Sequence, residues 1–263
     1  FADITGVDKR TLLASEVIIH GRKDVYGVVS CQPPHLQTEE EAKKTVSLDK
    51  LVIDIGFSEE KAKELVSVGD VISQKSKCIE LMNDQVSGKA FDDRAAVSAI
   101  IKAFENLQKT QLPYNLVMVA SAQEETGCRG ARTATYRVAP DEAIALDVSF
   151  AYTPDASKED TGELNKGPMI SYAATIKREL FKSLQTIAKA KKIPYQLEIM
   201  SATSGTNTDK IQLSRDGVAA GLISIPLKYM HTGIETLSLK DLENTAKLLT
   251  AYALSKKEEW ADA

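Results

Sequence analysis

Histidine, cysteine and tryptophan are scarce in this sequence, which has three histidines, three cysteines and one tryptophan among 263 residues. Cys31, Cys78 and Cys128 lie far apart and form no Cys-x-x-Cys pair, so we expect neither a disulfide framework nor a thiolate zinc site. Apolar runs near the roughly 20 residues that span a bilayer are lacking, and the first residues have neither the basic nor the apolar part of a signal peptide. These absences predict a cytoplasmic protein without a membrane partner.

An excess of one charge is lacking as well. The sequence has 33 basic and 37 acidic residues, for a formal net charge of -4, and it has no concentrated basic stripe. Proteins that bind nucleic acid usually carry such a stripe, so we expect no nucleic-acid partner. Apolar residues make up 43% of the chain, a fraction that allows a folded domain to bury a substantial core.

Short apolar runs separated by charged residues, proline or glycine characterise residues 1–85, a pattern typical of short strands. The clearest runs are 17–19, 25–29 and 51–55. Ser58 opens a segment with the pattern of a capped helix that continues to Leu65. We therefore expect a small β-rich domain over residues 1–85.

The pattern changes near Ser87 to alternating helices and strands. Three segments have apolar residues at three- and four-residue spacing and are predicted helices: 94–107, 176–191 and 239–254. Three continuous apolar runs are predicted strands buried on both faces: 116–120, 143–146 and 219–225. Residues 86–263 are therefore predicted to form an α/β domain, a sheet covered by helices.

Acidic residues stand at three chemically favourable places in this α/β domain. Asp92 and Asp93 precede a predicted helix, the pair Glu124 and Glu125 follows a predicted strand, and Asp147 follows the next strand. The ends of strands are where α/β sheets place their sites, and carboxylates gathered there repel one another unless a cation or a shared proton neutralises them. Because oxygen-rich sites with one or two imidazoles suit Zn, Co or Mn, a metal is the economical explanation.

Each of these residues also has a structural explanation. Asp92 or Asp93 could cap the following helix, and the glutamate pair could be a solvated turn. His231 follows the predicted strand 219–225, and a single histidine on a loop is more often a surface residue than a ligand. Asp147 is harder to explain in this way, since a carboxylate directly after a buried strand is costly without a partner. The histidine and the carboxylates together favour a metal centre.

Several collinear stretches carry a resemblance to a known family. They resemble, in order, the motifs of the M42 metallo-aminopeptidases, also described as glutamyl aminopeptidases or endoglucanase-like proteins: GKAFDDRAAVSAI, SAQEETGCRGARTA, ALDVSFAYTPDA, IPYQLEIMSATSGTNTD and ISIPLKYMHTGIETLSLKDL. YGVVSCQPPHL and LVIDIGFSEEKAKEL extend the resemblance to the first domain. It implies a metallopeptidase (phosphorylase/hydrolase-like) sheet covered by helices plus a smaller β-barrel lid domain. Residues 1–85 would then be the lid and oligomerisation domain, and residues 86–263 the catalytic domain.

The resemblance also implies roles for individual residues. Asp92 would bridge two divalent metal ions, most often Zn or Co, Glu125 and His231 would complete one metal, and Asp147 would bind the other. Glu124 would be the general base that activates the attacking water. The implied activity is removal of N-terminal residues from short peptides inside a homo-oligomeric shell of the dodecamer type. The residues that bind the substrate are not predicted.

Two stretches depart from the family pattern. The family's second ligand for the Asp147 metal is a histidine in a short His-x-Asp motif, and neither His20 nor His35 stands in such a motif. In the family that motif would precede Phe1, so we expect the chain to lack the first strand and helix of the catalytic domain and to bind one ion or none. The second stretch, 205–209, is either a loop on the substrate side or the N-cap of a helix beginning near Asp209.

Three functional hypotheses follow. The leading one is a metal-dependent aminopeptidase. A glycoside hydrolase is weaker, because that chemistry normally uses two carboxylates that flank the sugar and no metal. A non-catalytic scaffold or peptide-binding protein would keep the fold without a complete metal centre. Release of amino acids from peptides, its loss on chelation and the content of bound metal distinguish the three.

Overall fold

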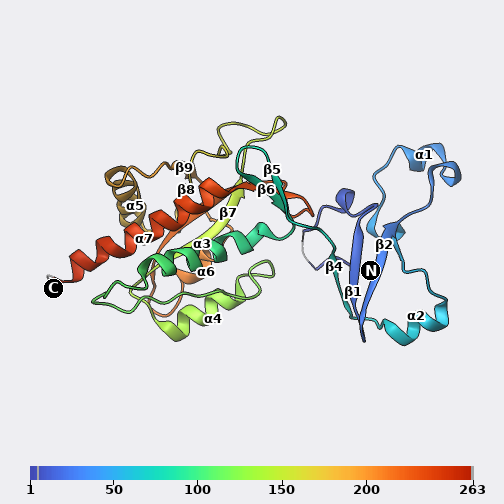
Figure 1. Cartoon of the computed structure of the whole chain (residues 1–263), viewed down its shortest axis with the longest axis horizontal. Helices are drawn as coiled ribbons and strands as arrows, with labels where there is room; N and C mark the ends of the chain where they lie inside the picture. The colour runs from blue at the N-terminus through green and yellow to red at the C-terminus, as the bar shows by residue number, and fades with distance from the viewer. Residues whose placement is uncertain (5, 262–263) are drawn as a thin grey trace. The chain divides into compact units, whose positions relative to one another are not determined.

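The computed structural model describes residues 1–4 and 6–261, and it forms two compact units. The first is built mainly from residues 1–78, and the second mainly from residues 79–230 together with the chain from 235 onward (Figure 1). Among the described residues, no helix combines the length and the apolar character that crossing a bilayer requires.

A four-stranded antiparallel sheet forms the centre of the first unit, in the order β3-β2-β1-β4. Its strands are β1 (Glu16–His20), β2 (Asp24–Ser30), β3 (Val52–Asp54) and β4 (Val71–Gln74). The unit also contains two short α-helices and three 3-10 turns: α1 (Glu39–Ala42), α2 (Glu59–Leu65), η1 (Lys9–Thr11), η2 (Pro34–Leu36) and η3 (Leu48–Lys50). β2 alternates between exposed and buried side chains along its length, as expected for a sheet with one covered face.

A seven-stranded mixed sheet forms the centre of the second unit. Six strands follow the order β5-β6-β11-β10-β8-β9, and β7 pairs with β10 in parallel. The bounds are β5 (Ile79–Leu81), β6 (Gln85–Gly88), β7 (Glu142–Phe150), β8 (Met169–Tyr172), β9 (Gln196–Ile199), β10 (Ala219–Lys228) and β11 (Glu235–Ser238). β10 contacts β7, β8 and β11 and is buried over nearly its whole length.

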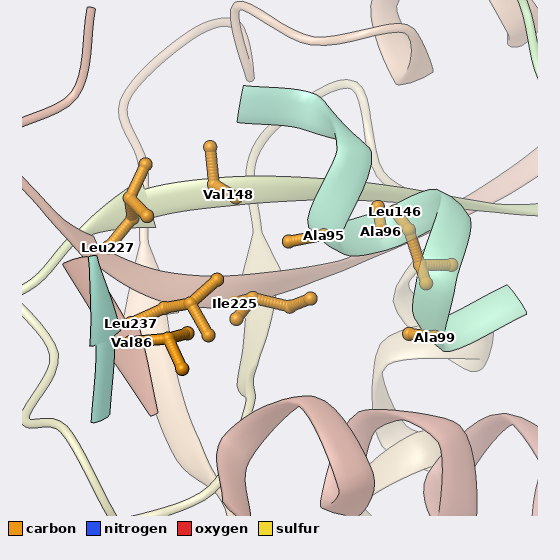
Figure 2. Close-up of a cluster of buried hydrophobic side chains, with 9 residues drawn as sticks. All are labelled: Val86, Ala95, Ala96, Ala99, Leu146, Val148, Ile225, Leu227 and Leu237. Carbon is orange, nitrogen blue, oxygen red and sulfur yellow. The ribbon is translucent and has the colours of Figure 1, made fainter. Parts of the chain in front are cut away.

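Helices cover both faces of this sheet. They are α3 (Phe91–Leu107), α4 (Arg129–Val138), α5 (Arg178–Ala190), α6 (Thr208–Ile211) and α7 (Leu239–Ala261). On one face, Leu146 and Ile225 pack against alanines of α3 (Figure 2). On the same face, Ile223 packs against residues of α5 and α7. On the other face, Ala145 and Leu222 pack with residues of α4 and α6. The unit is therefore a sheet between two helical layers, and the predicted α/β class is confirmed.

Most predicted elements have observed counterparts. The three predicted helices are α3, α5 and α7, and Ser58 caps α2 by accepting a hydrogen bond from the backbone N–H of Lys61. The prediction of a buried strand over 116–120 is wrong: this run forms no strand, and Val117 is 53% exposed. The apolar residues there predicted burial, but a strand needs a hydrogen-bonded neighbour, and in the described part of the chain β7 pairs with β10 and not with this run.

The face of the sheet that α4 and α6 cover changes character along the strands. On β7 the side chains of this face run from Ala145 through Asp147 to Ser149, and on β10 from Leu222 to Ser224. Alternate residues of a strand share one face, and the parallel register pairs Asp147 with Ser224. Polar side chains on this face therefore begin where the helical cover ends.

Candidate metal centre

Two consecutive aspartates stand at the start of α3. The buried carboxylate of Glu235, on β11, accepts the backbone N–H groups of Phe91 at 2.6 Å and Asp92 at 3.1 Å. Asp93 Oδ1 accepts the backbone N–H of Ala96 at 3.1 Å, which is the role of an N-cap. Asp93 therefore caps the helix, as one of the two sequence interpretations predicted. Asp92 has its backbone fixed by a buried acid.

Glu124 and Glu125 lie in a tight loop before α4. The carbonyl oxygen of Glu124 accepts the backbone N–H groups of Gly127 at 2.9 Å and Cys128 at 2.8 Å. The buried Cys128 thiol lies 3.2 Å from Glu124 Oε1 and donates to it. Burial and this hydrogen bond raise the pKa of the Cys128 thiol to about 12, so it remains a donor near neutral pH. The loop thus holds Oε1 of the Glu124 carboxylate by a hydrogen bond, and Oε2 can accept a proton or a hydrogen bond from another group.

Gly130 locks this loop to α4. Its backbone N–H donates to Ala122 O at 2.9 Å, and a Cβ at position 130 would lie 2.3 Å from that same oxygen. Since that separation is far below contact distance, the backbone of the loop would have to move. Only glycine allows this close approach.

We expect Gly130→Ala to displace the loop that carries Glu124 and Glu125. A shift of about 1 Å in catalytic groups can lower activity by about a hundredfold, so kcat should fall by that order. Initial-rate kinetics on metal-loaded protein measure the effect. Thr133→Ala, at an exposed position of the same helix, is the matched control and should leave kcat within about twofold. Unchanged kcat in Gly130→Ala would show that the loop tolerates the shift.

Asp147 lies inside β7 rather than after it. The sequence predicted that the strand ends at Leu146, whereas β7 continues to Phe150 because Val148 and Phe150 keep their register with β10. The Asp147 side chain is 8% exposed, and its Oδ1 accepts the backbone N–H of Val148 at 2.9 Å. A single hydrogen bond from the next residue does not offset the cost of burying a negative charge, so the Asp147 carboxylate needs a proton or a cation as well.

The carboxylates of these segments influence one another. Burial, followed by the charge of Asp147, raises the pKa of Asp93 to about 9. Burial, followed by the charges of Asp92, Glu124 and Glu125, raises the pKa of Asp147 to about 8. The structure therefore brings all five acidic residues into one electrostatic cluster. At neutral pH this cluster stabilises protons, or a cation in their place.

His231 follows β10, on the segment that leads to β11. One ligand atom each of Asp92, Glu125 and His231 lies within 4.8 Å of the others, the one such group found in the described part of the chain. Carboxylate oxygens with one imidazole are a donor set that suits Zn, Co or Mn. The residues therefore fit a divalent metal, on the chemistry of the donors and on the raised pKa values of the neighbouring carboxyl groups.

The raised pKa values predict how the metal-free protein responds to pH. The folded state keeps protons on Asp93 and Asp147 that the unfolded chain releases near pH 4, so stability decreases as the pH rises from about 4 to about 9. We expect the melting temperature with chelator to fall by at least about 5 °C between pH 6 and 9. Differential scanning calorimetry measures the change. Added divalent metal, or Asp147→Asn, should flatten the slope, and a slope unaffected by either would contradict the assignment.

Asp209 organises the loop that the sequence left between two interpretations. Its carboxylate accepts the backbone N–H groups of Ser204 at 3.0 Å and Gly205 at 2.9 Å, and the hydroxyl of Thr175 at 3.0 Å. α6 begins at Thr208, so a helix does start here, but Asp209 ties down the preceding loop from inside the helix. The amide of Asn207 donates to Ser121 Oγ at 3.2 Å, which links this loop to the one that carries Glu124.

Two residues of the site had no predicted role. Glu235 supports Asp92 across a distance of more than 140 residues in sequence, and a glutamate in a short mixed segment gives no signal of its own burial. Cys128 was noted only for the absence of a partner cysteine. Its spacing of four from Glu124, with glycine between them in a turn, was the one available hint.

Comparisons with known proteins agree on one family. The family model of the M42 glutamyl aminopeptidases matches residues 1–248. Lysyl aminopeptidase of Pyrococcus furiosus is 34% identical over 252 residues, 94% of this chain and 72% of that protein. A TET aminopeptidase from a marine sediment archaeon of the Thaumarchaeota has a TM-score of 0.91 and 32% identity, covering 99% of this chain and 76% of that one. The Pyrococcus horikoshii TET1 peptidase has a TM-score of 0.84 and 32% identity, covering 96% and 76%.

These matches run along nearly the whole chain, at an identity and a structural similarity that go beyond a shared fold. The acidic cluster of the second unit gathers carboxylates of the kind that can bind divalent metals. The chain therefore belongs to the M42 glutamyl aminopeptidase family and is a metal-dependent aminopeptidase.

Proposed function

We propose that this protein removes N-terminal residues from short peptides and that Glu124 is its general base. Asp92, Glu125, Asp147 and His231 would hold two divalent metal ions, Zn or Co, with Asp92 shared between them. The observation that carries this proposal is the cluster of carboxylates at which the pKa of Asp147 rises to about 8, next to ligand atoms of Asp92, Glu125 and His231 within 4.8 Å of one another.

Divalent ions bound there would polarise the scissile carbonyl and increase the acidity of a nearby water. Glu124 is positioned by its backbone and by Cys128, and its free Oε2 takes a proton from the attacking water. The oxygen of that water forms a bond to the peptide carbonyl carbon. Glu124 then transfers the proton to the departing nitrogen as the C–N bond breaks, which leaves a free amino acid and a peptide shortened by one residue.

The remaining acids have supporting roles in this proposal. Glu235 fixes the backbone of Asp92 through two hydrogen bonds, so the Asp92 carboxylate starts from one defined position. Asp93 caps α3 by accepting the backbone N–H of Ala96, and burial beside Asp147 raises the pKa of its carboxyl group to about 9, so it stays protonated near neutral pH in the metal-free protein. Because the proposed ligands come from a helix start, a loop, a strand and a connecting segment, folding assembles the centre.

The proposal includes assembly and location. The Pyrococcus horikoshii TET1 peptidase can assemble into a tetrahedron or a large octahedral shell. We infer a homo-oligomeric shell of the dodecamer type for this protein as well, in the cytoplasm, with residues 1–85 as the lid and oligomerisation domain and residues 86–263 as the catalytic domain. A shell of this kind would restrict the substrates to short peptides. Sedimentation velocity and negative-stain microscopy test the assembly.

A panel of tripeptides with different N-terminal residues tests the activity. We expect the metal-loaded protein to release the first residue, detected by chromatography, and to stop after chelation. Replacement of Zn or Co should restore the release. Peptides with an acetylated N-terminus should remain intact, because an aminopeptidase requires the free amine. Cleavage of acetylated peptides, or release that resists chelation, would contradict the proposal.

The two other hypotheses predict different results in the same experiments. A glycoside hydrolase would cleave cellulose after chelation, but five mutually repelling carboxyl groups resemble a cation site more than two acids that flank a sugar. A non-catalytic scaffold would bind peptides without releasing amino acids. It would also bind metal weakly, so measured metal content separates it from the aminopeptidase.

A further inference from the structure

The sheet of the second unit carries another polar cluster, centred on Glu198 of β9. Three serine hydroxyls donate hydrogen bonds to its carboxylate: Ser149 to Oε1, and Ser171 and Ser224 to Oε2, the last at 2.9 Å. The Oγ atoms of Ser171 and Ser224 also lie 3.0 Å apart. Because the serines come from β7, β8 and β10, the carboxylate has donors from three different strands.

The three serines are buried, with exposed fractions of 8% for Ser149, 0% for Ser171 and 1% for Ser224. Glu198 is itself partly buried, and within the described part of the chain it forms no ion pair with a lysine, arginine or histidine. Hydroxyl groups orient a carboxylate but leave its negative charge in place. Charges away from bulk water are usually paired, so a cation that reached this carboxylate would gain a favourable partner.

The cluster lies close to the proposed catalytic centre within the same sheet. Ser149 follows Asp147 by two residues on β7, so both side chains project from one face and their Cα atoms are about 7 Å apart. Ser224, another donor to Glu198, pairs with Asp147 across β10. The Glu198 carboxylate, which Ser149 and Ser224 hold, therefore lies on the same face of the sheet as the acidic cluster. Its distance from Asp147 is of the order of the length of one lysine side chain.

We propose that Glu198 determines specificity by binding the side-chain cation of an N-terminal lysine or arginine, an inference that rests on the proposed aminopeptidase function. The α-amino group is only two bonds from the scissile carbonyl carbon and would remain beside the catalytic carboxylates. A lysine ammonium extends about 6 Å from its own Cα, which is close to the separation of about 7 Å between the Cα atoms of Asp147 and Ser149 on β7. The serines hold the carboxylate in place, so binding a cation loses little side-chain freedom.

Lysine and norleucine test this inference, because norleucine has the lysine chain without its charge. Tripeptides that differ only in this first residue are compared by kcat/KM on metal-loaded protein. We expect lysine to be preferred at least about tenfold, the size expected for a charge-assisted hydrogen bond. Equal kcat/KM values for the two peptides in the wild-type protein would overturn the inference without any variant.

Glu198→Gln keeps the shape and removes the charge. We expect kcat/KM for the lysine peptide to fall at least about tenfold, while the norleucine value stays within about threefold. A parallel loss on both peptides would mean a structural role and would overturn the inference. Glu142→Gln is the matched control, since Glu142 lies in the same sheet, on β7, and accepts the Tyr252 hydroxyl at 2.8 Å, and this variant should keep the lysine preference.

Binding distinguishes failure of this inference from failure of the proposed function. If no peptide is cleaved, the proposed function fails, and titration calorimetry with lysinamide and norleucinamide then decides the inference. Tighter binding of lysinamide to the wild-type protein, lost in Glu198→Gln, supports it. Equal affinities overturn it.

Discussion

Glu124→Gln is expected to lower kcat about a thousandfold while the protein keeps its bound metal. Glutamine has nearly the same shape but cannot accept the proton of the attacking water, and general base catalysis contributes about a hundredfold to ten-thousandfold. The amide can still accept the Cys128 thiol at the position of Oε1, so the loop should stay in place. Single-turnover kinetics on a tripeptide, together with metal analysis of the same sample, measure both quantities.

The matched control for this variant is Glu80→Gln. Glu80 is an exposed glutamate of β5, and the substitution should leave kcat and metal content unchanged. A Glu124→Gln protein that turns over at a normal rate would exclude Glu124 as the base. Loss of metal in that variant would instead move Glu124 from the role of base to that of ligand.

Asp92→Asn is expected to remove both metal and activity. Asp92 is the proposed shared ligand, and a neutral amide binds a divalent ion far less well than a carboxylate. The Lewis acidity that is lost corresponds to several kcal/mol, or about a thousandfold in rate. Plasma emission spectrometry of dialysed protein should find less metal than in the wild type, and the tripeptide assay should find little release.

The backbone of the Asp92→Asn variant should remain in place, because Glu235 holds the N–H groups of Phe91 and Asp92 and not the Asp92 side chain. Asp84→Asn is the control: Asp84 is an exposed carboxylate that pairs with Lys240 at 2.7 Å, and its loss should change neither metal content nor rate. Full metal occupancy in Asp92→Asn would contradict its role as a ligand. Together, Glu124→Gln and Asp92→Asn distinguish a general base, whose replacement leaves the metal bound, from a ligand, whose replacement releases the metal.

Local signals in the sequence were sufficient where an element depends on its own residues. Ser58 caps α2, and Asp93 caps α3, because a capping side chain and its N–H donors lie within three residues of each other. The apolar periodicity of 176–191 corresponds to α5, whose buried face includes Leu180 and Leu184. These elements could be read from the chain because nothing distant competes with them.

Local signals failed where pairing decides the outcome. The apolar run 116–120 looks like a buried strand, yet a strand requires a neighbouring strand to complete its hydrogen bonds. In the structure this run is not part of any strand. Asp147 looked like the end of a strand because it is charged, but its pairing with Ser224 carries β7 onward to Phe150. The neighbouring strand, not the residue's own propensity, determines where a strand ends.

The sequence by itself determined the chemistry available to this protein: the carboxylates at Asp92, Glu124, Glu125 and Asp147, one histidine at His231, and the motifs that identify the family. Only the tertiary structure decided how these charges interact. Asp93 and Asp147 are 54 residues apart in sequence, counting from 93 to 147, and their pKa values rise because folding buries them beside each other. The same holds for Glu198, whose three serine donors come from three strands. Electrostatic repulsion and burial depend on distance in space, which a linear sequence does not contain.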